Sequence, residues 1–329
     1  MTRVLVSGAG GFVGLPLLAQ LTRTGREVHA LSTRARPSTP AGVHWHVLDL
    51  ADGAAVEELV NELAPEQLVH LAWCTEHGRF WHAPENVVWV ERSLQLMRAF
   101  VRRGGQRMVM LGTCAEYDWS SIDGPLVEAS SPVAPATLYG VAKDALRRVA
   151  ERYAEQQSVE LAWGRLFFLY GPREAPGRLV ASVIRSLLAG QPVATGHGGR
   201  IRDFMHVEDV AGAAAALLDS SVTGAVNIAS GIGVSVQELV ELIVREAGHP
   251  ELVRVGALRD RADEPSLLLA DVARLRDEVG YRPRWALADG LAATARWWQE
   301  RDPRLIRGAA SRTGARPCSP RPAWAGRRR

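Results

Sequence analysis

A glycine-rich turn near the amino terminus constrains the fold of this chain more than any other feature. The segment "RVLVSGAGGFVG" is a β-branched apolar run that breaks into glycines, and "LPLLAQLTRTG" follows with helical spacing and a closing Gly25. Gly8, Gly11 and Gly14 therefore lie between a strand and a helix, in a GxxGxxG arrangement. Glycine lets a backbone approach a pyrophosphate, whose charge is stabilised at a helix N-terminus. The flanking strand and helix favour a dinucleotide site over a simple tight turn.

The following segments alternate between strand and helix patterns. "EVHAL", "WHVLDL" and "QLVHLAW" are short apolar runs, separated by helical stretches such as "AAVEELVNELA". This alternation predicts an α/β fold with a Rossmann-type doubly wound parallel sheet. At 329 residues, 47% of them hydrophobic, the chain is long enough for a smaller C-terminal lobe. We expect a dinucleotide-binding domain over residues 1–170, to which a segment around 205–230 returns, and a mainly substrate-binding lobe over residues 171–300.

The end of the second predicted strand bears on the choice of cofactor. About 20 residues after the glycines, an NAD site expects an acidic residue for the ribose hydroxyls. Here the residues are Ser32, Thr33 and Arg34, without a carboxylate. Hydroxyls and a guanidinium suit a 2′-phosphate, so NADP(H) is favoured, with NAD(H) as the alternative. The alternative for Arg34 and Arg36 is that they are solvated loop charges.

The basic charge of the chain is concentrated at its carboxyl end. Residues 303–329 hold 8 Arg and no acidic residue, so the body carries 39 − 8 = 31 basic against 36 acidic residues. A nucleic-acid partner is therefore not expected for the body. The tail, residues 301–329, is rich in Pro, Gly, Ala and Arg without periodicity, which predicts disorder. We interpret it as an inert extension rather than a site for an acidic partner.

Cysteine usage and apolar runs indicate a cytoplasmic protein. Cys74, Cys114 and Cys318 form neither a disulfide framework nor paired metal ligands. His44 and His46 share a strand face without a third ligand nearby in the sequence, so no metal site is predicted. The amino terminus lacks a signal-peptide layout, and no apolar run approaches the roughly 18 residues of a membrane span.

The chain has a single lysine. Lys143 stands in "YGVAK", whereas the other 38 basic residues are all arginine. Lysine is a compact ammonium on a slim stem, and arginine is a wide planar fork. The lone lysine therefore suggests a tight place that needs a small cation, against the alternative of an ordinary surface residue. Tyr139 lies four residues earlier, so on a helix the two side chains share a face.

Eight motifs together resemble one family. In order they are "GAGGFVG", "LDL", "VHLAW", "MLGTCAEYD", "YGVAK", "GRLFFLYGP", "RDFMHVEDV" and "VNIASG". The chain resembles the extended short-chain dehydrogenase/reductases, the NAD(P)-dependent nucleotide-sugar epimerase, dehydratase and reductase group, over about residues 3–298. The resemblance implies cofactor contacts from the following positions: Gly8, Gly11, Phe12, Val13, Gly14, Ser32, Thr33, Arg34, Asp49, Leu50, Leu71, Ala72, Trp73, Tyr139 and Lys143.

The resemblance also implies a catalytic set. Thr113 would hydrogen-bond the reacting oxygen, and Tyr139 would donate or accept its proton. A free tyrosine has a pKa near 10, and an ammonium a few ångströms away favours the phenolate. We therefore expect Lys143 to lower the pKa of Tyr139 and to hydrogen-bond the nicotinamide ribose.

Two motifs depart from the family pattern. Sugar 4,6-dehydratases of this group place Asp and Glu directly after the catalytic threonine, where this chain has Cys114 and Ala115. Glu116 comes one residue later and is expected to point elsewhere, so dehydration is not expected. Phe168 stands where many nucleotide-sugar enzymes have Asn, so the nucleotide cannot be inferred from that motif.

Substrate contacts are expected from two regions. Arg202 and Arg261 match positions at which the family holds the substrate's pyrophosphate, with ion pairs to Asp203 or Asp263 as the structural alternative. The loop "CTEHGRFWHAPEN" follows a strand's carboxyl end, where open α/β sheets bind ligands. The polar and aromatic residues of that loop expected to line the sugar pocket are His77, Trp81 and His82.

The sequence therefore predicts an NAD(P)-dependent enzyme acting on a nucleotide sugar. We favour a 4-ketoreductase of an NDP-4-keto-deoxyhexose, because the Ser-Thr-Arg stretch suits an exchangeable NADPH and the dehydratase acids are missing. A C4 epimerase with tightly bound NAD is the alternative, and a non-catalytic dinucleotide-binding regulator is an alternative of another class. The family resemblance further implies a homodimer.

Overall fold

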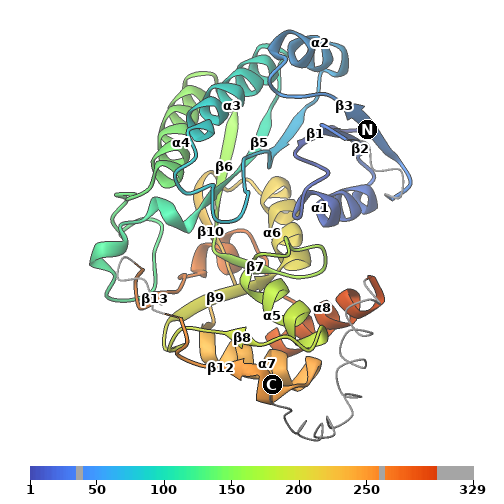
Figure 1. The fold of residues 1–329 in the computed structure, drawn as a ribbon. Helices are drawn as coiled ribbons and strands as arrows, with labels where there is room; N and C mark the ends of the chain where they lie inside the picture. The colour runs from blue at the N-terminus through green and yellow to red at the C-terminus, as the bar shows by residue number, and fades with distance from the viewer. Residues whose placement is uncertain (35–39, 259–263, 302–329) are drawn as a thin grey trace, which may run out of the picture.

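A seven-stranded parallel sheet forms the larger of two lobes in the computed structural model, which describes residues 1–34, 40–258 and 264–301 (Figure 1). The strand order is β10-β6-β5-β4-β1-β2-β3, and every neighbouring pair is parallel. The predicted Rossmann-type fold is confirmed. The strands are β1 (Arg3–Ser7), β2 (Glu27–Ser32), β3 (Val43–Val47), β4 (Gln67–His70), β5 (Arg107–Thr113), β6 (Glu160–Leu166) and β10 (Gly224–Ile228).

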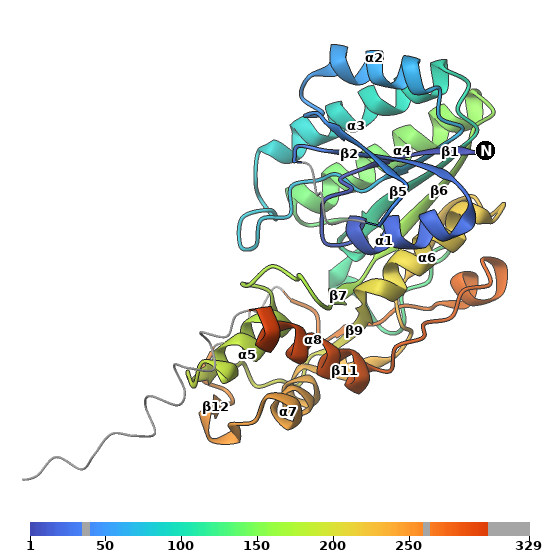
Figure 2. The ribbon, with the colours of Figure 1, turned by 90° about the vertical axis from the view of Figure 1, so that its right-hand side faces the viewer.

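Helices cover both faces of this sheet, as Figure 2 shows. One face carries α1 (Gly14–Leu21) and α6 (Val207–Asp219), and the other carries α2 (Gly53–Leu63), α3 (Glu85–Arg102) and α4 (Leu138–Gln156). All seven residues of β5 are buried, because a parallel strand covered on both faces must be apolar on both. Several helices begin where a side chain supplies a cap: Thr137 accepts a hydrogen bond from Gly140 N at 3.2 Å at the start of α4.

The second lobe is built around a smaller sheet. Strand β9 (Ile201–His206) pairs with β7 (Phe168–Tyr170), β11 (Gly233–Ser235) and β13 (Leu267–Leu268), while β8 (Val193–Ala194) pairs with β12 (Val253–Arg254). Its helices α5 (Leu179–Leu188), α7 (Val236–Ala247) and α8 (Leu287–Arg301) enclose a separate apolar core. The remaining short turns are η1 (Thr22–Thr24), η2 (Cys114–Glu116), η3 (Trp119–Ser121), η4 (Pro250–Leu252) and the π-helical η5 (Arg274–Glu278).

Two strands end earlier than their sequence patterns predict. Strand β3 ends at Val47 and β4 ends at His70, so "LDL" and "LAW" lie in loops. The pairing stops there because the neighbouring strands stop: β2 ends at Ser32 and β1 ends at Ser7. The residues expected to contact the cofactor are therefore at the carboxyl edge of the sheet rather than within its strands.

Candidate active site

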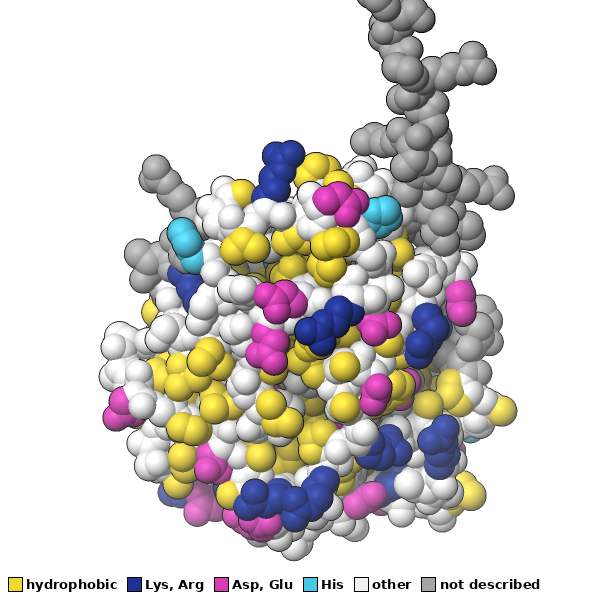
Figure 3. Space-filling view, turned by 90° about the horizontal axis from the view of Figure 1, so that it is seen from below, with side chains coloured by type: hydrophobic (Ala, Val, Ile, Leu, Met, Phe, Trp, Pro, Cys, Tyr) yellow, Lys and Arg dark blue, Asp and Glu magenta, His cyan; other side chains and the backbone are white. Residues whose placement is uncertain are grey.

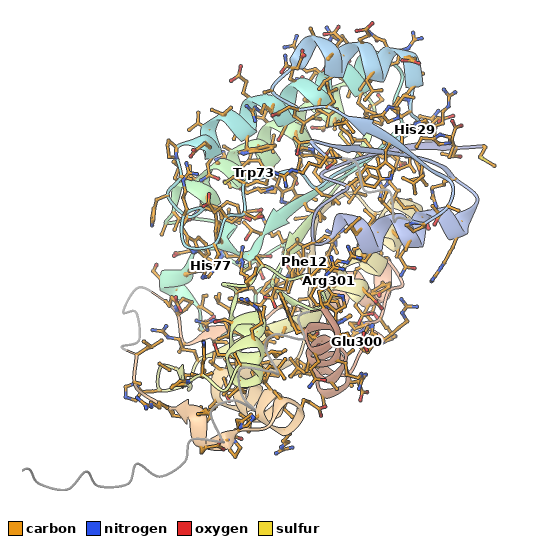
Figure 4. The ribbon with its side chains drawn as sticks, turned by 45° about the vertical axis from the view of Figure 1, so that its right-hand side comes forward. Phe12, His29, Trp73, His77, Glu300 and Arg301 are labelled. Atoms are coloured by element: carbon orange, nitrogen blue, oxygen red, sulfur yellow. The ribbon has the colours of Figure 1, made fainter. Side chains whose placement is uncertain are left out.

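The glycine-rich turn fits a dinucleotide. Gly8 has a φ of +70°, and a Cβ there would lie 2.7 Å from Ala72 N. A Cβ at Gly14 would overlap the Ala9 carbonyl oxygen. Helix α1 begins at Gly14 without a side-chain cap at Val13, and since Leu15 N donates to Gly11 O and Pro16 has no N–H, the Gly14 N–H is the one in its first three residues that suits a diphosphate. Phe12 and Val13 of the same turn are half-buried, and Figure 4 shows Phe12 at the level where the two lobes meet.

The predicted ribose end of the cofactor site lies beside this turn. Ala9 N donates to Leu31 O at 3.3 Å, which brings the end of β2 against the glycines. Ser32 closes β2, and Thr33 and Arg34 follow it as exposed residues. The Ser32 hydroxyl accepts a weak hydrogen bond from Arg34 N at 3.4 Å.

The other predicted cofactor residues gather at the same edge. Leu71 N donates to Ser7 O at 3.1 Å, which carries the chain from β4 across the end of β1. Asp49 is exposed, and its Oδ1 accepts a hydrogen bond from Ala51 N at 2.9 Å. Leu50 is buried under α2 and α3, and Ala72 and Trp73 pack against the same core.

Thr113 and Tyr139 meet at the carboxyl end of β5. The Thr113 side chain acts on the Tyr139 phenol, and Thr113 is 7% exposed. Tyr139 is half-buried, and two aromatic rings meet it edge-on: the Phe80 centroid lies 5.0 Å from it and the Trp81 centroid 5.8 Å. Burial raises the pKa of Tyr139, and the neighbouring Thr113 side chain opposes this shift.

Lys143 shares a face of α4 with Tyr139, but its ammonium group is directed elsewhere. Lys143 Nζ donates to Leu111 O at 2.7 Å and lies 3.8 Å from the Trp73 ring centroid. Burial lowers the pKa of Lys143 to about 7, with the Glu116 charge opposing. We expected Lys143 to lower the pKa of Tyr139. In the structure burial dominates and the Tyr139 pKa is raised, with Arg178 as the cation that opposes the shift.

Glu116 fixes the backbone beneath the threonine. It is fully buried, and its Oε1 accepts Thr113 N at 2.8 Å in a capping box. The other carboxylate oxygen of Glu116, Oε2, accepts a hydrogen bond from Arg165 Nε at 2.8 Å. Trp163 Nε1 donates to both carboxylate oxygens. Glu116 therefore points into the interior and holds Thr113 in place. No such role was expected for Glu116, although the Thr-x-x-Glu spacing of a capping box is a local signal for its contact with Thr113. Only its partners Trp163 and Arg165, 47 and 49 residues away, lie beyond the reach of local patterns.

The loop after β4 covers the tyrosine. Tyr139 N donates to Trp81 O at 3.1 Å, so backbone as well as ring contacts join this loop to α4. His77 is exposed and lies against Gly177 of the second lobe, where a Cβ would be 3.0 Å from the His77 Cδ2. Figure 4 shows His77 between the lobes. His82 is exposed in the same turn.

Arg202 comes from the second lobe. It lies in β9, is 4% exposed, and its charge reaches Cys114, which adjoins Thr113. Its Nη2 lies 3.4 Å from Glu264 Oε2, so its acidic partner is Glu264. Asp203, the partner weighed from the sequence, instead accepts hydrogen bonds from the Ser230 and Gly231 backbone. Arg261 and Asp263 lie outside the described residues.

Arg178 is a site residue that the sequence did not reveal. Its Cζ lies 4.9 Å from the Phe80 ring centroid, and its charge acts on both Tyr139 and His77. It stands 39 residues after Tyr139 in a loop before α5, and no local pattern connects the two.

The histidines of β3 form a cluster away from this edge. His29 Nδ1 lies 3.0 Å from His46 Nε2, and the His29 and His44 rings stack at 5.1 Å. Within residues 1–34, 40–258 and 264–301, no group of three His, Cys, Asp or Glu side chains is arranged to hold a metal ion.

A dinucleotide-type turn and a neighbouring Thr–Tyr pair at the carboxyl edge of a parallel sheet define an enzyme of the NAD(P)-binding Rossmann class. The model of the NAD dependent epimerase/dehydratase family matches residues 4–229. The chain belongs to this family, and the resemblance to the extended short-chain dehydrogenase/reductases is confirmed.

Named relatives span the nucleotide-sugar enzymes. "dTDP-6-deoxy-L-talose 4-dehydrogenase (NAD(P)(+))" of Kitasatospora kifunensis is 30% identical over 308 residues, covering 88% of this chain and 93% of the relative. "UDP-glucose 4-epimerase" of Corynebacterium glutamicum is 28% identical over 309 residues, covering 85% of this chain and 91% of the relative. The structure of "MoeE5 in complex with UDP-glucuronic acid and NAD" has 30% identity and a TM-score of 0.79, and covers 91% of this chain and 99% of that one.

No helix of residues 1–34, 40–258 or 264–301 is both long enough and apolar enough to cross a membrane.

Proposed function

We propose that this enzyme is an NAD(P)-dependent 4-ketoreductase of an NDP-4-keto-deoxyhexose. The observation that carries the proposal is the placement of Thr113 next to Tyr139 at the carboxyl edge of the sheet, beside a turn that fits a dinucleotide. Cys114 and Ala115 follow the threonine, and both are buried and non-acidic, which disfavours the elimination step of a dehydratase. The talose 4-dehydrogenase relative supports chemistry at C4.

The chain's own residues account for proton transfer at the C4 oxygen. The bound cofactor supplies the hydride that adds to the carbonyl carbon. Tyr139 donates its phenolic proton to the C4 oxygen, and the Thr113 hydroxyl hydrogen-bonds that oxygen and orients it. The phenol is protonated at neutral pH and can donate; burial raises its pKa and makes it a weaker acid, a shift that Thr113 and the Arg178 charge oppose. The Phe80 and Trp81 rings cover part of the half-buried Tyr139 ring.

An NDP-sugar C4 epimerase with tightly bound NAD is the second candidate. The named UDP-glucose 4-epimerase relative favours it, and the same threonine, tyrosine and lysine serve both reactions. A non-catalytic dinucleotide-binding regulator is the candidate of another class.

The experiment that separates these candidates uses purified protein and a panel of 4-keto and 4-hydroxy nucleotide sugars. NADPH absorbance and products are followed together. A reductase consumes NADPH with a 4-keto sugar and yields one alcohol. An epimerase interconverts 4-hydroxy sugars without net NADPH loss. A Tyr139→Phe variant that binds cofactor but turns over at the wild-type rate would remove the catalytic assignment.

We also propose NADPH as the preferred coenzyme. Ser32, Thr33 and Arg34 follow β2 without a carboxylate, and Thr33 and Arg34 are exposed beside the glycine turn. Arg34→Ala should weaken the binding of NADPH and leave the binding of NADH unchanged. Fluorescence titration with each coenzyme measures both affinities. Equal binding of both coenzymes before and after the change contradicts the preference.

The remaining proposals concern substrate and assembly. Arg202 and Arg261 would hold the substrate diphosphate, and His77, Trp81 and His82 would line the sugar pocket. Arg202 fits this role because its charge lies near Cys114 while its pairing to Glu264 is long, at 3.4 Å. We propose a cytoplasmic homodimer without a nucleic-acid partner. Figure 3 supports the last point, since acidic and basic side chains are interspersed on the face that it shows.

A further inference from the structure

The loop after β4 is connected to the second lobe through Arg178. Arg178 Nη2 donates to Thr75 O at 3.3 Å, and the neighbouring Gly177 backbone lies against the His77 ring. The same guanidinium lies 4.9 Å from the Phe80 ring centroid. Phe80 is 5% exposed and meets Tyr139 edge-on at 5.0 Å. A chain of contacts thus runs from the second lobe through Phe80 to the proposed proton donor.

Helix capping does not explain an arginine at this position. Arg178 is the N-cap residue of α5, and its side chain makes no capping hydrogen bond. Ser, Thr, Asp and Asn are preferred there, because their side chains accept the first helical N–H groups. The Arg178 side chain instead crosses to the other lobe, so its contacts with the loop are what the residue contributes.

We propose that Arg178 is a positioning residue for Tyr139: it fixes the Thr75–Phe80 loop against the second lobe, and through Phe80 it holds the Tyr139 ring in place. The inference rests on the proposed function insofar as Tyr139 is the proton donor.

The charges around Tyr139 come from both lobes. Burial raises the pKa of Tyr139, as do Cys114 and Glu116 on the β5 side, while Thr113 and Arg178 lower it. Glu116 is neutralised by Arg165 and lies 3.8 Å from Arg147. Glu174, just before α5, is buried and acts on Arg178, and burial raises the pKa of its carboxyl to about 8. The remaining charged or titratable groups that face this region from the packed elements are Lys143 of α4, directed at Leu111 and Trp73, His77 of the loop, and Arg202 of β9 beside Cys114.

The test uses the full-length enzyme with Arg178→Gln, Arg178→Lys and the control Arg185→Gln. Arg185 also lies over an aromatic ring, with its Cζ 5.1 Å from the Trp298 centroid, but it belongs to α5 away from the loop. Arg79 is exposed within the loop, so trypsin can report how firmly the loop is held. Cleavage after Arg79, followed by mass spectrometry, should be about tenfold faster in Arg178→Gln and unchanged in the control.

The split between kcat and KM is the second readout, which a purely structural role would not move. Because Phe80 packs edge-on against Tyr139, Arg178→Gln should lower kcat by about tenfold and leave KM and the melting temperature nearly unchanged. Arg178→Lys keeps the charge but not the planar stacking over Phe80, so it should show the same loss of kcat. Unchanged cleavage after Arg79 together with an unchanged kcat in Arg178→Gln overturns the proposal. An active Tyr139→Phe enzyme overturns the proposed function, whereas the cleavage rates still decide whether Arg178 holds the loop.

Discussion

The surroundings of Lys143 explain why this basic residue is a lysine when all the others are arginine. Its Nζ has one acceptor, Leu111 O at 2.7 Å, and one aromatic face, Trp73 at 3.8 Å, and the residue is 4% exposed. A single ammonium donor on a slim stem fills such a place, whereas a guanidinium would overpack it by about 1–3 kcal/mol. The choice of residue therefore follows from shape as well as charge.

Replacing Lys143 with methionine should separate catalysis from stability. The loss of the ammonium removes the hydrogen bond that Lys143 is proposed to make with the nicotinamide ribose, so turnover should fall by roughly 10²-fold. The pKa of Lys143 is about 7 in the folded protein against 10.5 in a free side chain. Between these values the unfolded state binds more protons, so wild-type stability should rise as pH increases. Urea denaturation at pH 7, 8 and 9 measures how the free energy of unfolding rises with pH. The contribution of Lys143 to this rise should be absent in Lys143→Met.

The prediction is wrong if the free energy of unfolding changes by the same amount in wild type and in Lys143→Met over this pH range. Tyrosine ionisation in the unfolded state affects both proteins equally, so the difference between them isolates Lys143.

Glu116→Gln tests the buried carboxylate under Thr113. The amide keeps the acceptor for Thr113 N but leaves the charge of Arg165, which is 1% exposed, without its anion. We expect a loss of about 3–5 kcal/mol in the free energy of unfolding, measured by urea denaturation. Glu155→Gln is the matched control, because its pair with Arg152 is exposed and should contribute about 0–1 kcal/mol. If Glu116→Gln and Glu155→Gln lower the free energy of unfolding equally, the buried Arg165 charge does not require Glu116 as its counter-ion.

Helices α3 and α4 lie side by side on one face of the large sheet and present apolar side chains to solvent (Figure 1). Val87 is 61% exposed and Val88 40% on α3, and Val141 is 47% exposed and Val149 51% on α4. Exposed apolar residues on two adjacent helices are typical of an isologous dimer contact.

Charge introduced on this surface should prevent dimer formation. Val141→Glu combined with Val149→Glu should convert a dimer to a monomer in sedimentation at micromolar concentration, with little change in melting temperature. Val255→Glu is the control, since Val255 is 57% exposed but lies in the second lobe. A wild-type protein that sediments as a monomer refutes the homodimer itself.

The two lobes are joined at the site rather than merely linked along the chain. The large lobe supplies the glycine turn, Thr113 and Tyr139, and the second lobe supplies Arg178 and Arg202. Helix α8, the last described element, ends at Arg301, which lies over the Trp297 ring at 6.0 Å. The predicted tail beyond it falls on residues outside those described.

Truncation after Arg301 should leave turnover within a few-fold of the full chain. The removed segment has 8 Arg and no acidic residue between 303 and 329, and its composition does not supply a packed core. Steady-state rates and melting temperatures of the two proteins provide the comparison. A large loss of activity at an unchanged melting temperature would show that the tail acts at the site.

The sequence by itself determined the parts that depend on local pattern. Glycine spacing after an apolar run predicts the β1–α1 turn, and the four-residue spacing of Tyr139 and Lys143 predicts a shared helical face. Tertiary structure decided what each side chain meets. Arg178 acts on Tyr139, Glu264 pairs with Arg202, and Lys143 donates to Leu111 O, over separations of 39, 62 and 32 residues. Backbone periodicity is set by near neighbours, whereas such contacts depend on strand order and on how two lobes meet, which no spacing in the chain encodes.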